Sequence, residues 1–136
     1  ALPILRLNRC ALAVVLTASA LAAVASERTL VTSDAQGNAW HLETDSMSRK
    51  GYVVYVWQLR NLAQADANGA LSIRAKVEFD CRFRQTRMMW MTLHSERDEE
   101  GKVISSGAVP SPEWTPVTAG STEDALLDYA CRRIMR

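Results

Sequence analysis

The sequence has few of the residues and patterns that mark catalytic and metal-binding proteins. It contains two histidines, His41 and His94, and three cysteines, and none of them has the Cys-x-x-Cys or His-x-x-x-His spacing of common metal sites. A glycine-rich phosphate loop is missing, as is a serine or cysteine motif that would accompany a catalytic base. We therefore expect no metal, no cofactor and no enzymatic activity, and we interpret both histidines as structural or solvent-exposed.

A large basic excess and a long membrane-spanning run are also missing. The chain has 16 basic and 15 acidic residues, whereas a protein that binds nucleic acid through its phosphates has a large, clustered basic excess. The uncharged, mostly apolar run at residues 10–24 is shorter than the roughly 20 strongly apolar residues that span a bilayer. We expect neither a nucleic-acid partner nor a retained membrane helix.

The first 25 residues have the features of a signal peptide. Arg6 and Arg9 form a short positive region, the run at 10–24 is rich in alanine, leucine and valine, and Ala23-Val24-Ala25 is a small-x-small cleavage site. The sequence therefore predicts that residues 1–25 are a signal peptide and that residues 26–136 form a single exported domain.

Cleavage would remove Cys10 and leave Cys81 and Cys131 in an oxidising compartment. Two cysteines in an exported domain favour one disulfide between them, whereas the competing alternative, a metal site, lacks its ligand spacing. The bond would close a loop of about 50 residues, for which the chain-entropy model gives roughly 4 kcal/mol of stabilisation as an upper figure.

Most of the domain has strand patterns. Between Ser72 and Cys81 the apolar residues occupy every second position, so we expect Cys81 to point into the core with them. Residues 52–59 have high strand preference on both faces, which suits a central strand. Asn68-Gly69 lies between these two strands and predicts a hairpin with a type I′ turn. Further strands are expected at residues 29–32, 40–44, 85–94 and 103–105.

Regular alternation in residues 85–94 places Met88 and Trp90 on one side of that strand and Met89 on the other.

The connections between the strands are expected to be irregular. Residues 45–51 form a polar segment, and residues 106–116 contain three prolines that suit an extended crossover. In the charged hairpin loop at 95–102, we expect the acidic residues to be solvated.

The pattern changes to helical spacing near the C-terminus. Ser121 is an N-cap candidate with Asp124 three residues on, as in a capping box. Residues 127–134 contain one apolar stripe, and Cys131 lies in the middle of it. Because Cys81 lies on the apolar face of a strand, packing the helix on the sheet brings both thiols to the same layer. The residues thus predict an α+β domain in which a disulfide ties helix to sheet.

Basic residues gather along the strand at 72–81 and just after it. Strand alternation places Arg82 and Arg84 on the polar side of the sheet, in register with Arg74 and Lys76. Such a stripe can meet an acidic partner; the alternative is that neighbouring acidic residues pair with it. The candidate binding residues are Arg74, Lys76, Arg82, Arg84 and Arg87.

The chain also has four tryptophans and three tyrosines, more than a core of this size requires. Surface-exposed tryptophan and tyrosine are typical of protein interfaces. We nevertheless expect most of the tryptophans to lie in the core.

An ordered set of motifs spans most of the domain. The set consists of Asp45-Ser46, Arg49-Lys50-Gly51 and Trp57, then Val77-Glu78-Phe79-Asp80-Cys81, then Trp114, Val117, Gly120-Ser121, Leu127 and Cys131. Together these residues resemble the surface-adhesin protein E family of Gram-negative bacteria. The resemblance implies a curved antiparallel sheet of about five to six strands, with a C-terminal helix held on its concave face by a disulfide.

The resemblance also implies a location and a type of partner. The expected protein is an exported, non-enzymatic, adhesin-like binding module of the periplasm or cell surface. Its partner would be a host extracellular protein or an envelope component, and the sheet could form a homodimer. One departure is that Cys10 follows an arginine, which does not fit a lipid-attachment site. The alternative function is a periplasmic structural or assembly subunit of a membrane-associated complex.

Overall fold

The computed structural model describes residue 3, residues 14–20 and residues 26–134. Residues 14–20 form neither helix nor strand, and the rest of the predicted signal peptide apart from residue 3 lies outside the described residues. Its cleavage therefore stays a prediction. None of the described helices combines the length and the apolar character that crossing a membrane requires.

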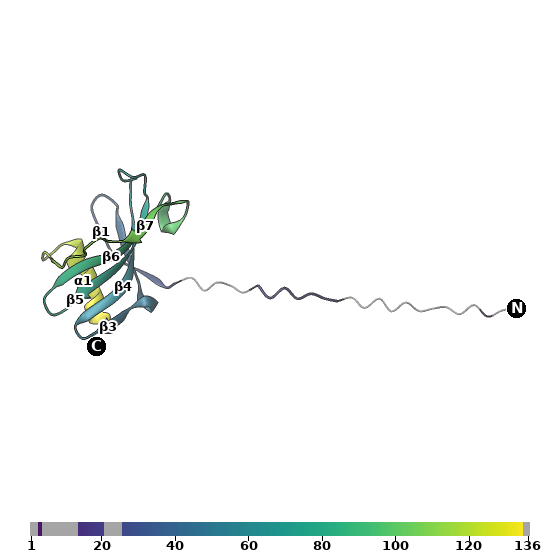
Figure 1. Ribbon diagram of the computed structural model, residues 1–136, viewed down its shortest axis with the longest axis horizontal. Helices are drawn as coiled ribbons and strands as arrows, with labels where there is room; N and C mark the ends of the chain where they lie inside the picture. The colour runs from purple at the N-terminus through teal and green to yellow at the C-terminus, as the bar shows by residue number, and fades with distance from the viewer. Residues whose placement is uncertain (1–2, 4–13, 21–25, 135–136) are drawn as a thin grey trace.

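The domain is an open antiparallel sheet with one helix, α1, lying across it (Figure 1). Eight strands are present among the described residues, and six of them follow one another in the order β1-β2-β4-β5-β6-β7. The short strands β3 and β8 pair with β4 and β6, and neither was expected from the sequence. The bounds are β1 Arg28–Ser33, β2 Ala39–Glu43, β3 Ser48–Lys50, β4 Val53–Asn61, β5 Ser72–Asp80, β6 Gln85–His94, β7 Val103–Ala108, β8 Thr115–Pro116 and α1 Thr122–Ile134, with single 3-10 turns η1 Thr44–Ser46 and η2 Arg97–Glu99.

Strands β4 and β5 form the antiparallel hairpin that the sequence predicts, but its turn is not type I′. The Asp66 carboxylate accepts hydrogen bonds from the backbone N–H groups of Asn68 and Ala70. Gly69 has a positive φ of 80°, whereas Asn68 does not. A type I′ turn needs positive φ at both central residues, so the predicted turn type was wrong.

Strand alternation gives the sheet an inner face, which packs against α1, and an outer face, which is turned away from it. The inner face carries the apolar residues of β2, β4 and β5, and α1 covers them with an apolar stripe that includes Leu126 as well as the predicted Leu127 and Ala130. The buried core consists of Trp40, Leu42, Val54, Val56, Ala75, Val77, Phe79, Leu126, Leu127 and Ala130.

A β-bulge changes the faces predicted for β6. Lys76 of β5 pairs with Trp90, but the next residue, Val77, pairs with Met88, so Met89 is the extra residue. Met88 consequently packs against the core, whereas Trp90 lies on the outer face and is 39% exposed. The prediction that Met88 and Trp90 share a face was wrong because the bulge reverses the alternation.

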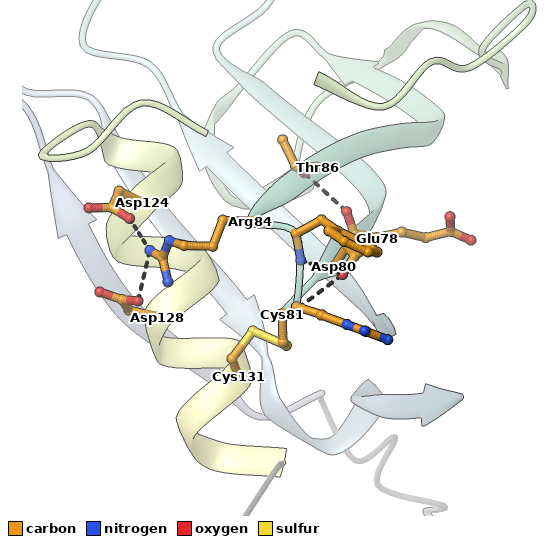
Figure 2. Close-up of a disulfide and its surroundings, with 10 residues drawn as sticks. Glu78, Asp80, Cys81, Arg84, Thr86, Asp124, Asp128 and Cys131 are labelled. Atoms are coloured by element: carbon orange, nitrogen blue, oxygen red, sulfur yellow. Dashed lines mark hydrogen bonds and ion pairs between the residues drawn. A yellow bond between two sulfur atoms is a disulfide. The ribbon is translucent and has the colours of Figure 1, made fainter. Parts of the chain in front are cut away.

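The N-cap of α1 and the disulfide agree with the sequence-based expectation. The Ser121 hydroxyl accepts a hydrogen bond of 3.2 Å from the Asp124 N–H. The Asp124 carboxylate accepts its hydrogen bond from the N–H of Gly120 and not of Ser121, so the second bond of the predicted capping box is displaced by one residue. A disulfide joins Cys81, directly after β5, to Cys131 of α1, and the two Cα atoms are 5.8 Å apart (Figure 2). The predicted α+β fold and the predicted pairing of the two cysteines are confirmed.

Replacing both disulfide cysteines, as Cys81→Ser with Cys131→Ser, should lower the free energy of unfolding by roughly 2 to 4 kcal/mol, because the unfolded chain regains the entropy of an open 50-residue loop. Urea denaturation followed by circular dichroism measures the change. Two free thiols in an Ellman titration of the unreduced wild-type domain would contradict the disulfide itself.

Candidate interaction surface

The outer face presents a lysine between two tryptophans. Trp57 of β4, Lys76 of β5 and Trp90 of β6 lie opposite one another in the strand register, and we call them the outer row. Directly paired residues on neighbouring strands have Cβ atoms about 5 Å apart, so these side chains share one surface. Lys76 is exposed and has no ion-pair partner among the described residues. The outer row is therefore a cation flanked by aromatic rings.

Arg74, next to the outer row, belongs to a network of two arginines and two glutamates. Its guanidinium donates two hydrogen bonds of 3.0 Å to the Glu43 carboxylate and lies 3.1 Å from Glu99. Arg28 pairs with the same two glutamates. Glu43 is 2% exposed, so its charge depends on these partners. We call Arg28, Glu43, Arg74 and Glu99 the four-charge cluster.

The four-charge cluster corrects the expectation that the acidic run in the 95–102 loop is merely solvated. Besides the ion pairs of Glu99, the Asp98 carboxylate accepts a hydrogen bond from the side chain of Asn61. The backbone N–H of Glu99 donates to the hydroxyl of Ser72, which is fully buried. The loop thus folds back onto β4 and β5. Sequence patterns alone did not identify Glu43 or Glu99, because their partners come from distant strands.

Arg87 and Arg84 are also held by acids. Arg87 of β6 forms an ion pair with the buried Glu78. Its guanidinium carbon also lies 4.4 Å from the ring centroid of Trp114, and this contact links β6 to the crossover. Arg84 reaches the helix, where it pairs with Asp124 and lies 3.0 Å from Asp128 (Figure 2). These two aspartates raise the pKa of Arg84, with the hydrogen bond to Asp128 as the largest contribution.

The direction of Arg84 follows from the turn after β5. The strand ends at Asp80, whose carboxylate accepts hydrogen bonds from the N–H groups of Arg82 and Phe83 at 3.0 Å each. Arg84 itself has a positive φ of 48°. The strand register therefore does not continue to Arg82 and Arg84, and the prediction that they extend the Arg74 side of the sheet was wrong.

Arg82 lies at an exposed aromatic tip beside the disulfide. Its guanidinium carbon is 5.6 Å from the Tyr52 ring centroid and 5.2 Å from the Phe83 ring centroid, within cation–π range. Tyr52 is 54% exposed and Phe83 is 68% exposed. No acid among the described residues forms an ion pair with Arg82. We call Tyr52, Arg82 and Phe83 the aromatic tip.

The five predicted basic residues thus do not form one stripe. Arg74, Arg84 and Arg87 pair with acids, which was the alternative open at the sequence level, and Lys76 and Arg82 are the two without an ion pair in the described part of the chain. They belong to two separate places, the outer row and the aromatic tip.

Most tryptophans lie outside the core, contrary to the expectation. Trp40 is the one buried there, at 6% exposed. Arginine guanidinium groups stack on three of the indole rings, which covers part of each ring and makes partial exposure favourable. The pairs are Arg60 with Trp40 at 5.0 Å, Arg74 with Trp57 at 3.9 Å and Arg87 with Trp114 at 4.4 Å.

The two histidines lie on different strands, β2 and β6, and both are partly buried. The Nδ1 atoms of His41 and His94 are buried and have no hydrogen-bond partner among the described residues. Burial lowers the pKa of His94, and Arg74 lowers it further. Within residues 26–134, no group of three or more histidine, cysteine or acidic side chains is placed to hold a metal ion.

The family model of surface-adhesin protein E matches residues 29–132, most of the chain. The chain belongs to the surface-adhesin protein E family. The family is one of surface adhesins, so the chain is adhesin-like and its membership favours a non-enzymatic, exported surface protein. Among curated proteins, no relative matches.

Solved structures of Haemophilus influenzae protein E have the same fold. Crystal form II is 12% identical with a TM-score of 0.66, and the match covers 84% of this chain and 94% of that one. A second structure of the same protein is 12% identical with a TM-score of 0.60, covering 82% and 88%. The Se-Met form is 13% identical with a TM-score of 0.61, covering 82% and 91%. At this identity the likeness shows the fold alone.

Replacing Glu43 by glutamine should lower the free energy of unfolding by roughly 2 to 3 kcal/mol, because Arg28 and Arg74 lose their buried counter-charge. Urea denaturation at pH 7 measures the effect. The matched control is Glu100→Gln, an exposed acid of the same loop as Glu99, which should change stability by less than about 0.5 kcal/mol. Equal effects of the two substitutions would contradict the structural role of the four-charge cluster.

Acid should weaken the turn after β5. Burial by itself would raise the pKa of Asp80, but hydrogen bonds from Phe83, Gln85 and Arg82 outweigh it, and the pKa lies below its ordinary value. Because the pKa is lower in the folded state, the stabilisation is present above the unfolded aspartate pKa of about 3.9 and is lost as the pH falls through the folded value.

Urea midpoints measured between pH 6 and pH 2.5 test this expectation. The Asp80→Asn variant should be less stable than the wild type at pH 6, and the difference should shrink below pH 4. A constant difference across the whole range would show that the Asp80 charge contributes nothing.

Proposed function

We propose that the domain is an exported, non-enzymatic binding module of the Gram-negative envelope that captures a protein partner through the outer row and the aromatic tip. Membership of a surface-adhesin family supports adhesion in general. The observation that carries the proposal is that Lys76 and Arg82, the two candidate cations without an ion pair in the described residues, each lie beside exposed aromatic rings.

The chemistry of the two places favours a protein surface with acidic residues. Tryptophan, tyrosine and arginine dominate the binding energy of protein interfaces, because they combine a large apolar area with a polar or charged group. Trp90, Tyr52 and Phe83 provide exposed apolar area. Lys76 and Arg82 provide charge, because neither forms an ion pair with an acid among the described residues, although Arg82 interacts electrostatically with Asp80. A host extracellular protein or an envelope component with an acidic patch fits this surface.

The paired arginines support the surface indirectly. Arg74 holds the Trp57 ring in place, and Arg84 anchors the turn that carries Arg82 to α1. A surface whose side chains are already fixed loses less conformational entropy on binding. The proposal therefore assigns contact to Lys76 and Arg82 and positioning to Arg74 and Arg84, with Arg87 fixing the crossover.

A pull-down with the domain 26–136 from envelope extracts and from host extracellular proteins tests the proposal. Lys76→Ala with Arg82→Ala should reduce capture of the wild type's specific partners by at least about tenfold, since two contact residues of this kind are each worth about 1 kcal/mol or more. Lys102→Ala is the matched control, because it removes an exposed cation from the β6–β7 loop. Circular dichroism verifies that each variant folds.

Undiminished capture of every specific partner by the double variant would dismiss both surfaces. A second copy of the chain as the partner, the homodimer alternative, would instead appear in sedimentation of the pure domain. In that case Lys76→Ala with Arg82→Ala should shift the protein toward the monomer.

Localisation separates the adhesin from the alternative, a periplasmic subunit of a membrane-associated complex. For the adhesin, antibody should reach the protein on intact cells, and mass spectrometry should find a mature chain that begins at Ser26. Release with the periplasmic fraction together with a co-purifying complex would favour the subunit and count against surface adhesion.

A further inference from the structure

The inner face holds a cavity that is separate from the outer row and the aromatic tip. It has a volume of about 640 Å³ and lies between the sheet, the crossover before α1 and the first turns of α1. Binding pockets for small ligands typically measure about 300 to 1,000 Å³ and are mostly apolar with a few polar groups. Trp40, Val77 and Phe79 from the sheet and Leu126 from α1 provide the apolar lining. The cavity therefore has the size and lining of a binding site.

One lining residue, Gln58 of β4, is a mostly buried polar residue whose amide has no hydrogen-bond partner among the described residues. It is 9% exposed and lies on the inner face, opposite Ala75 of β5 and Leu42 of β2, both of which are fully or almost fully buried. Among the described residues, fully buried side-chain atoms without a partner occur at other positions and not at Gln58, so its amide reaches the solvent in the cavity. Gln58 is therefore a donor and an acceptor available inside the cavity.

The rim of the cavity is acidic. Glu113 of the crossover and Glu123 of α1 are both exposed and both line the opening. Arg87 also lines the cavity, but Glu78 neutralises it and its guanidinium stacks on Trp114. The charges left at the rim are thus two carboxylates, which favour a cationic group on whatever enters.

We propose that this cavity binds an extended peptide segment in which an aromatic or branched aliphatic residue is followed by lysine or arginine. The apolar side chain would fill the space beside Trp40 and Leu126. A peptide group carries one N–H donor and one carbonyl acceptor, and the Gln58 amide complements both. The basic side chain would face Glu113 and Glu123. A purely apolar ligand leaves Gln58 unpaired, and an anion meets like charge at the rim.

The proposal is independent of the outer surface, so the two can fail separately. The probe is a blocked dipeptide of phenylalanine followed by lysine, with a blocked dipeptide of phenylalanine followed by norleucine as its neutral counterpart. Titration into the ¹⁵N-labelled domain 26–136, followed by NMR, should shift the side-chain NH₂ signals of Gln58. The lysine dipeptide should bind more tightly than the neutral one.

The key variant is Gln58→Leu, which keeps a side chain of similar volume and removes the amide. Affinity for the lysine dipeptide should fall by about tenfold, while thermal stability should change little, because the Gln58 amide makes no hydrogen bond to the described residues that the substitution could remove. A residue needed only for structure would lose stability instead. Glu113→Gln with Glu123→Gln should weaken the lysine dipeptide severalfold and leave the neutral dipeptide unchanged, whereas Glu100→Gln should affect neither.

Three outcomes would overturn the proposal. One is the absence of any shift at Gln58 with either dipeptide at millimolar concentration. Another is equal affinity of the wild type and the Gln58→Leu variant for the lysine dipeptide. The last is binding of the neutral dipeptide that is as tight as or tighter than that of the lysine dipeptide, which would make the site an apolar cavity with no preference for a basic residue.

Discussion

The domain depends on how the chain turns after β5. The Asp80 carboxylate accepts hydrogen bonds from two backbone N–H groups and from the Gln85 side chain. These hydrogen bonds end the strand and hold a turn that reverses the chain within four residues. That turn delivers Cys81 and Arg84 to α1, where one forms the disulfide and the other pairs with Asp124 and Asp128 (Figure 2). A single helix on a sheet has few neighbours of its own, so these links fix its place. The inner cavity, bounded partly by α1, depends on the same turn.

Some charged residues of the domain form ion pairs that stabilise the fold, whereas others have no ion pair and remain available to bind a partner. Glu43 and Glu99 engage Arg28 and Arg74, so these arginines hold the β6–β7 loop against the sheet and have little charge left for a partner. Arg82 stacks on exposed rings instead and keeps its charge. Removing one member of a buried ion pair destabilises the fold, because the other charge is left without a partner. A cation on the surface beside an aromatic ring is hydrated, and a binding partner can replace that water at a small cost in free energy.

Much of the architecture was predictable because it follows from local periodicity. The alternation at 72–81, the central strand before it and the capped helix are each encoded in a short window of residues. The pairing of Cys81 with Cys131 followed from counting the cysteines left in a domain that the sequence predicts to be exported. Two of the failures came from local deviations from strand alternation: the extra residue Met89 placed Met88 and Trp90 on opposite faces, and the turn after Asp80 redirected Arg84. Periodicity contains no sign of where such a deviation falls.

The amino-acid sequence by itself determined the fold class, the disulfide and the five basic candidate residues, because the spacing of apolar residues and the composition decide which side chains are buried in the core. Only the tertiary structure decided which of those basic residues are neutralised. The partners of Arg74 come from β2 and the β6–β7 loop, and those of Arg84 come from α1. The same holds for Gln58, which looks like an ordinary strand residue until the crossover and α1 enclose the space in front of it. Contacts between distant segments set charge and exposure, and no local pattern records them.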